Sequence, residues 1–234
     1  LSIKKMKNCK QCITRQLNSL GELTKDELIR VSGCKTSLFI KRDEVLFEEG
    51  KYINGIFCIK DGICKVTKMS TNGRDQIIKL VKRGDLLGER SLISEEVTNL
   101  KATALNDMEV CFIPKEEIIR DLKSNTSFTM SVLKDMADSL KEADNIIVDM
   151  AQKTVKQRLA ETLLFLNKSF GSDNKEEPLN IELSREDIAN IVGTATESAI
   201  RLLSSFKKEK LIHLKGKKNY ILNPNKLKVI ANSF

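Results

Sequence analysis

The chain is poor in the residue types on which most catalytic and metal sites depend. It contains a single histidine, His213, in 234 residues, which excludes a His-based catalytic triad and a metal centre built from several histidines. It has neither a Walker A sequence nor a GxGxxG fingerprint. No constellation of nucleophile, base and stabilising group is evident, so we do not expect an enzyme.

Long apolar runs are also missing. No segment is long and apolar enough to span a bilayer, so we expect no membrane partner. The N-terminal residues LSIKKMKNCKQC are charged and lack the apolar segment of a signal peptide. We therefore expect a cytoplasmic protein whose six cysteines are reduced, which favours metal or redox roles over disulfides.

The charge of the chain points to a polyanionic partner. Lysine and arginine outnumber aspartate and glutamate by 40 to 32, which gives a formal net charge of +8. Counterion release favours the binding of such a chain to nucleic acid, although a lysine-rich solvated surface would give the same balance. The length allows one large or two ordinary domains, each with its own core.

Residues 38–114 have the pattern of a β domain. Short apolar segments alternate with glycine-containing turns such as Asp61-Gly62 and Asn72-Gly73. Many short strands with regular turns are typical of a small barrel or jelly roll. A short helix is expected upstream, where Thr24 and Glu27 have the spacing of a capping box.

A long helix is expected after the β domain, because residues 127–170 contain neither glycine nor proline. Within it, seven positions alternate at spacings of three and four residues, as in a coiled coil. These positions are Met130, Leu133, Ala137, Leu140, Asp144, Ile147 and Ala151, of which Asp144 interrupts the apolar stripe. Such a stripe favours a homodimer; the alternative is that it packs on its own domain.

Residues 184–222 predict a winged helix-turn-helix, which is a DNA-binding motif. Two short helices meet at Val192-Gly193, and capping boxes are expected at Ser184 with Asp187 and at Thr194 with Glu197. A terminal hairpin turns at 216–218, where a wing could place lysines against phosphates. The wing lysines are Lys215, Lys217 and Lys218.

The second helix of this motif is expected to read bases. Apolar residues repeat at i, i+3, i+4 and i+7 from Ala199, so Glu197 and Arg201 point outward. Arginine suits a bidentate bond to guanine, and glutamate accepts from cytosine N4; the alternative is that Glu197 only caps and pairs with Arg201. The expected DNA-binding residues are Arg185, Thr194, Thr196, Glu197, Ser198, Ile200, Arg201 and Lys217.

A barrel, a long dimer helix and a winged helix in this order resemble the CRP/FNR superfamily of bacterial transcription regulators. The segments that carry the resemblance are GDLLGE at 84–89 and IVGTATESAIRLLSSFKKEKLI at 191–212. It implies an α+β fold and a homodimeric regulator that reads a palindrome on double-stranded DNA and contacts RNA polymerase. The expected divisions are a Cys-containing segment (1–22), a sensory cyclic-nucleotide-binding-type barrel (23–125), a dimerisation helix (126–155) and the winged helix-turn-helix (156–234).

The resemblance implies that Glu197 and Arg201 read a G·C pair in each half-site. The small residue Thr196 before the glutamate is similar to the FNR-like branch rather than to cyclic-AMP-type members. Glu89 matches the glutamate that holds a cyclic-nucleotide ribose, but no arginine occurs at Thr98-Asn99, where the phosphate partner would fall. Cyclic AMP is therefore not the expected effector.

The cysteines also resemble the FNR-like branch, which binds a [4Fe–4S] cluster through three N-terminal cysteines and one before an Ile-Pro. Cys9, Cys12 and Cys111 match, whereas the third N-terminal position holds Asn18. Cys34 is a candidate fourth ligand, since four thiolates are usual; Cys58 and Cys64 are expected to be buried apolar residues. Three readings stay open: a cluster, a thiol sensor, or cysteines without a role.

The competing functions are therefore a regulator without a cluster, responsive to a small ligand or to no effector, and a protein-binding module. Steep salt dependence on duplex DNA and preference for a palindrome would separate the DNA-binding regulator from the protein-binding module.

Overall fold

The computed structural model describes residues 12–71, 73–172 and 177–233. Cys9, Asn72 of one expected turn and 173–176 of the polar loop lie outside the described residues. The chain divides into two compact units, residues 1–73 with 78–141 and residues 74–77 with 142–234. Among the described helices, none has the length and apolar character needed to cross a membrane.

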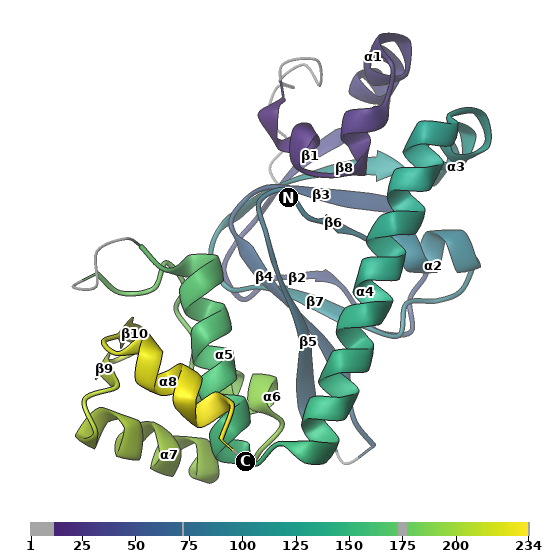
Figure 1. Ribbon diagram of the computed structural model, residues 1–234. Coiled ribbons are helices and arrows are strands. Elements are labelled where there is room, and N and C mark those ends of the chain that lie inside the picture. The colour runs from purple at the N-terminus through teal and green to yellow at the C-terminus, as the bar shows by residue number, and fades with distance from the viewer. Residues whose placement is uncertain (1–11, 72, 173–176, 234) are drawn as a thin grey trace. The chain divides into compact units, whose positions relative to one another are not determined.

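The first unit is built on two four-stranded sheets, with strand orders β1-β8-β3-β6 and β2-β7-β4-β5 (Figure 1). This arrangement is the expected barrel of the jelly-roll type. Its strands are β1 (Thr36–Ile40), β2 (Val45–Phe47), β3 (Gly55–Asp61), β4 (Ile63–Met69), β5 (Asp75–Lys82), β6 (Leu86–Leu87), β7 (Lys101–Ala104) and β8 (Met108–Pro114).

Strand alternation divides the apolar side chains of this unit between two cores. On β3, Phe57 and Ile59 belong to a core formed by residues of both sheets. The intervening Ile56 and Cys58 belong to a second core, which β3, β6 and β8 share with helices. Because successive side chains on a strand point to opposite faces, one sheet contributes to both cores.

Helices cover the outer face of the β1-β8-β3-β6 sheet. They are η2 (Ile13–Leu17), η3 (Ser19–Glu22), α1 (Lys25–Cys34), α2 (Glu89–Ser94), α3 (Lys115–Ser124) and the first part of α4 (Thr126–Gln152). The Thr24–Glu27 capping box at the start of α1 is confirmed.

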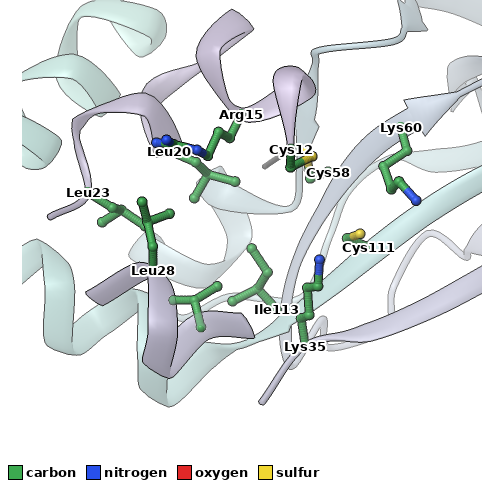
Figure 2. Close-up of a pocket in the computed structure, with 11 residues that line it drawn as sticks. Cys12, Arg15, Leu20, Leu23, Leu28, Lys35, Cys58, Lys60, Cys111 and Ile113 are labelled. Atoms are coloured by element: carbon green, nitrogen blue, oxygen red, sulfur yellow. The ribbon is translucent and has the colours of Figure 1, made fainter. Parts of the chain in front are cut away.

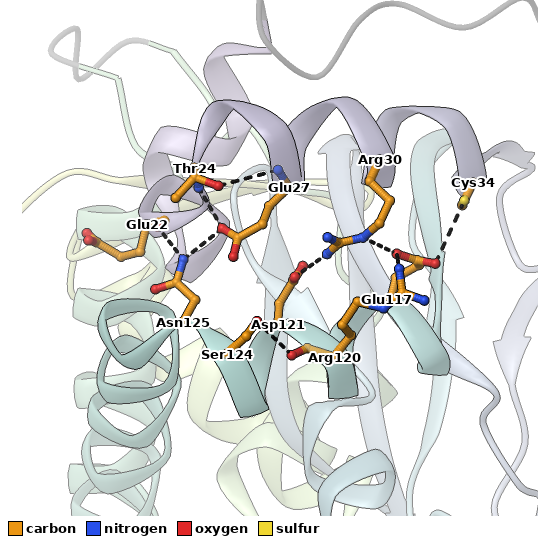
Figure 3. A network of polar contacts seen from close by, with 10 residues as sticks. All are labelled: Glu22, Thr24, Glu27, Arg30, Cys34, Glu117, Arg120, Asp121, Ser124 and Asn125. Atoms are coloured by element: carbon orange, nitrogen blue, oxygen red, sulfur yellow. Dashed lines mark hydrogen bonds and ion pairs between the residues drawn. The ribbon is translucent and has the colours of Figure 1, made fainter.

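An ion-pair network ties α1 to α3 (Figure 3). The guanidinium of Arg30 on α1 donates to Glu117 and Asp121 of α3. The side chain of Asp121 is fully buried, and this burial raises its pKa while Arg30 opposes the rise. A buried carboxylate is stable only with such a partner, so this network fixes how the two helices pack.

The stretch without glycine or proline forms two helices instead of one. α4 ends at Gln152 and α5 (Val155–Phe170) begins after Lys153 and Thr154. Thr154 starts α5 with a capping box to Gln157, and Lys153 Nζ lies 2.7 Å from carboxylate oxygens of both Asp149 and Glu161. The break is therefore a defined turn with its own polar contacts.

The second unit contains the expected winged helix-turn-helix. After α5 come α6 (Arg185–Val192), α7 (Thr196–Lys208), β9 (Ile212–Lys215), β10 (Lys218–Ile221) and α8 (Pro224–Ala231). The hairpin forms as predicted, with its second strand starting one residue earlier than expected. Helix α8 was not predicted, although Asn223 as N-cap and Pro224 at the first helical position are start signals.

Candidate DNA-reading helix and cysteine cavity

The turn between α6 and α7 is fixed by one glycine and one arginine. Gly193 has φ +70°, a left-handed conformation that ends α6 and suits glycine. The guanidinium of Arg158, on α5, donates to the carbonyl oxygens of Val192 at 2.9 Å and Gly193 at 3.3 Å, and to that of Lys153 at 2.7 Å. Arg158 thus binds the C-terminal end of α6, where a cation is favoured.

The capping box predicted at Thr194 and Glu197 is wrong. The backbone N–H of Thr194 donates to Ala189 O at 3.1 Å, so Thr194 still belongs to the C-terminal turn of α6. Ala195 is the N-cap of α7 and makes no side-chain cap. The box at Ser184 and Asp187, by contrast, is confirmed at the start of α6.

Helix α7 separates a buried face from an exposed face, as the apolar period predicts. Ala199, Leu203 and Phe206 are buried, whereas Glu197 and Arg201 are exposed. The Arg201 guanidinium donates to Ser198 Oγ at 3.4 Å, and it forms no ion pair with Glu197, which is likewise among the described residues. Both side chains are therefore accessible from solvent.

The remaining predicted DNA-binding residues lie around this face. Ile200 is exposed, Thr196 and Ser198 are half-buried at the start of α7, and Thr194 is half-buried in the turn before it. The wing lysines Lys215, Lys217 and Lys218 are exposed, so they can approach phosphates without rearrangement.

Arg185 connects α6 to the wing. Its guanidinium donates to Asn219 Oδ1 at 3.1 Å and to Gly216 O at 3.0 Å. Asn219 is buried and donates in turn to Lys217 O at 3.1 Å. Burial lowers the pKa of Arg185. The side chain predicted to contact DNA thus holds the wing turn in place.

The barrel region that corresponds to a cyclic-nucleotide site contains no arginine of the expected kind. Thr98 is buried, and its hydroxyl bonds to the backbone of Leu100 at 3.2 Å. Asn99 accepts a hydrogen bond from Arg90. Burial raises the pKa of Glu89 to about 7.

Three cysteines line one cavity on the outer face of the β1-β8-β3-β6 sheet (Figure 2). They are Cys12 before η2, Cys58 on β3 and Cys111 on β8. The cavity is about 20 Å³, enough for one water molecule. Its cationic lining consists of Arg15, Lys35 and Lys60.

The other cysteines lie elsewhere. Cys34 is exposed at the end of α1, with its sulfur 4.0 Å from Glu117 Oε1, and it does not line the cavity. Cys64 is buried in the core between the sheets, as expected, where burial raises its pKa to about 12. Within the described ranges, no three His, Cys, Asp or Glu side chains are placed to hold one metal ion.

Two family models match the chain. A cyclic nucleotide-binding domain matches residues 38–125, and a Crp-like helix-turn-helix domain matches residues 157–230. The two matches coincide with the barrel and with the helix-turn-helix unit.

The curated proteins and solved structures that the chain resembles include several regulators. The chain is 28% identical to an anaerobic regulatory protein of Bacillus subtilis over 82% of both chains. It is 28% identical to a fumarate and nitrate reduction regulatory protein of Vibrio cholerae over 96% of this chain and 90% of that one. The structure of FixK2 from Bradyrhizobium japonicum superposes with a TM-score of 0.76 at 20% identity, covering 86% of this chain and 98% of that one.

Proposed function

Because the chain belongs to the CRP/FNR superfamily of transcription regulators, we propose that it acts as a homodimer whose two α7 helices read a palindromic operator. The superfamily consists of DNA-binding regulators, not enzymes. The observation that carries the proposal is the exposed pair Glu197 and Arg201 on a helix whose opposite face is buried.

Base reading is assigned to the outward face of α7. Arg201 can bond guanine O6 and N7, and Glu197 can accept from cytosine N4. Ile200 is exposed beside them and suits a thymine methyl group. The first turn of α7 lacks a side-chain cap, so its amide groups suit a DNA phosphate near Thr194 and Thr196. The wing lysines supply further phosphate contacts.

Homodimer formation is supported by the apolar side chains that α4 leaves exposed. Leu140 is 65% exposed and Ile147 66% exposed. They share the predicted coiled-coil stripe with Met130 and Leu133, which are also exposed. A second copy would bury this stripe, and a two-fold dimer would place two α7 helices for half-sites about 34 Å apart.

For the effector, we favour redox-sensitive chemistry at the cysteine cavity over cyclic AMP. Iron–sulfur clusters are held by cysteine thiolates, and the cavity gathers three thiols with three cationic side chains. The buried Nε of Arg15 has no hydrogen-bond partner among the described residues, so it can donate to a sulfur ligand. A bound cluster would supply iron chemistry that responds to oxygen or nitric oxide. In donor type and charge these residues suit such a group, but the described thiols are one short of the usual four and the cavity has room for one water molecule, so a cluster would need a further ligand and a wider site.

The effector proposal is tested by anaerobic purification followed by iron and sulfide analysis and a visible spectrum. We expect about four irons and four sulfides per chain, with a broad band that bleaches in air. Iron-free, colourless protein that still binds a palindrome would remove the cluster and leave a thiol switch, another small ligand or no effector. By resemblance to the superfamily, we also expect a cytoplasmic protein that contacts RNA polymerase.

DNA reading is tested by fluorescence anisotropy with duplexes that carry inverted half-sites. We expect Arg201→Ala to weaken binding by about 1–3 kcal/mol and to relax the preference at one base pair of each half-site. The matched control is Lys208→Ala, an exposed cation in the last turn of the same helix, which should leave base preference unchanged. Equal weakening on all sequences would make Arg201 a phosphate contact, and salt-insensitive binding would favour a protein-binding module.

A further inference from the structure

We propose that Cys58 and Cys111 form a reversible disulfide between β3 and β8 when a hydroperoxide oxidises the protein, and that this bond alters the packing of α4. The inference deepens the proposed redox chemistry at the cysteine cavity by naming the two thiols that react. It requires no bound cluster, because both sulfurs come from described residues of this chain.

The pairing of β3 with β8 places the two thiols opposite each other. Cys58 and Cys111 are partners in the antiparallel register, and the Cα atoms of such partners lie about 4.5 or 5.5 Å apart. Both values fall within the range of about 4.4–6.8 Å that is usual for disulfides. Both side chains belong to the core on the helix-covered face of the sheet, so both point to the same side.

The other described cysteines are less well placed to pair with either thiol. Cys34 is exposed at the end of α1, and Cys64 lies in the core between the sheets; neither lines the cavity. Cys12 does line it and is half-buried (Figure 2). However, Cys12 lies outside the strands, so no register holds it against Cys58 or Cys111.

Hydrogen peroxide can oxidise such a pair in two balanced steps. One thiol attacks the O–O bond of the peroxide, which gives a sulfenic acid and releases one water molecule. The second thiol then attacks the sulfenic sulfur, so that an S–S bond forms and a second water molecule leaves. Exchange with an external dithiol supplies two electrons and two protons and returns both thiols.

The surroundings of the two sulfurs suit this chemistry. Asn18 donates from Nδ2 to Cys58 Sγ at 3.6 Å, and Ser37 Oγ lies 4.0 Å from Cys111 Sγ. A thiolate, which is the form that attacks peroxides, is stabilised by donors and by nearby cations, and three cationic side chains line the cavity. Both thiols are buried, which shields a sulfenic acid from further peroxide and leaves the opposite thiol to react with it.

The bond would act on α4 because both sulfurs lie in the core that holds the first turns of this helix. Phe128 and Val132 of α4 are buried there together with Cys58 and Cys111. Opposed Cβ atoms in a sheet are about 4.5–5.5 Å apart, whereas a disulfide holds them about 3.5–4.5 Å apart. Bond formation therefore draws the sulfurs together. Because close-packed cores transmit such shifts, oxidation should change how α4 presents its apolar stripe to a second copy.

The first test is a tryptic map of the full-length protein after treatment with hydrogen peroxide. Trypsin cleaves after lysine and arginine, so Cys58 falls in peptide 52–60 and Cys111 in peptide 102–115. The remaining thiols are blocked with N-ethylmaleimide in denaturant before digestion. We expect these two peptides to be linked, and dithiothreitol to separate them. A link from either peptide to the one that carries Cys12, in place of the expected pair, would overturn the proposal.

Iron and sulfide contents measured on the same sample separate this inference from the cluster. A linked pair in iron-free protein would support the disulfide without a cluster. Protein that holds iron and sulfide but never forms the linked pair would overturn the disulfide and leave the cluster function intact.

The second test is fluorescence anisotropy with a duplex that carries inverted half-sites. We expect the reduced and oxidised forms to differ at least about fivefold in affinity, and Cys58→Ala and Cys111→Ala to bind equally under both conditions. The matched control is Cys64→Ala, which removes a buried sulfur from the other core of the same unit and should keep the difference. Far-UV circular dichroism reports whether each variant is folded.

Two results of this second test would contradict the proposed effect on α4. Equal affinities of the reduced form and the disulfide-linked form would show that the bond has no regulatory role. A difference that persists in folded Cys58→Ala would assign the response to other thiols. Absence of binding in both forms would contradict the DNA-reading function instead, and the peptide map would still decide whether the disulfide forms.

Discussion

Arg158 should control the local stability of the helix-turn-helix. Its guanidinium makes three hydrogen bonds, to the carbonyl oxygens of Lys153, Val192 and Gly193. A hydrogen bond to a charged group contributes about 1.5–3 kcal/mol. Because one bond is long and the side chain is half-exposed, the three together should contribute about 2–4 kcal/mol rather than their sum.

The assay is native-state hydrogen exchange of Arg158→Ala. Opening of α6 should become about 30- to 1000-fold more frequent, since about 1.4 kcal/mol corresponds to a factor of ten. Amides of β3 and β8 in the barrel should be unaffected and serve as an internal reference. Arg158→Lys should recover only part of the protection, because one ammonium lacks the planar fork of the guanidinium. Unchanged exchange in α6 would show that the turn is held by Gly193 and packing alone.

Three further predictions concern separate parts of the chain. Lys217→Ala should weaken binding to all duplexes equally and reduce the slope of log K against log salt by about 1, measured by anisotropy at several salt concentrations; a change in base preference would contradict this. Leu140→Asp should shift the chain from dimer to monomer in sedimentation equilibrium. Ser139 is exposed beside Leu140 but lies outside the stripe, so Ser139→Asp should stay dimeric. A dimeric Leu140→Asp variant would place the dimer interface elsewhere. Burial raises the pKa of Glu89 from 4.5 to about 7, so between these pH values the folded state binds more protons than the unfolded state. The free energy of unfolding should therefore fall by roughly 2–3 kcal/mol as pH rises from 4.5 to 7. Urea unfolding of Glu89→Gln should lack this pH-dependent loss of stability.

Much of the fold follows from periodicity in the sequence. The barrel strands, the α6–α7 pair and the wing hairpin all carry local signals, namely alternation, apolar spacing and glycine-containing turns. The Thr194 capping box failed because the Schellman-type turn of α6 extends one residue past Gly193. Sequence spacing alone does not show which of two helices a turn residue belongs to.

The candidate sites, too, could be predicted from the sequence only in part. The exposed face of α7 could be predicted, since it depends on the spacing within one helix. The role of Arg158 could not, because it links three segments separated by up to 40 residues through their backbones. The sequence correctly predicted that Cys58 is buried, but its position opposite Cys111 depends on the β3–β8 register, which no local pattern specifies.

The hydrogen bonds of Arg185 fix the position of the wing relative to α6. The Arg185 guanidinium donates to Gly216 O and Asn219 Oδ1, and the Asn219 amide donates to Lys217 O, so hydrogen bonds tie the wing turn to the start of α6. The protein then sets the distance between the contact of α7 in the groove and the contact of the wing with a phosphate. A half-site whose phosphate lies at another distance must deform to be bound. Because DNA stiffness depends on sequence, the protein would also discriminate between sequences at base pairs that no side chain touches, namely those between the helix contact and the wing contact.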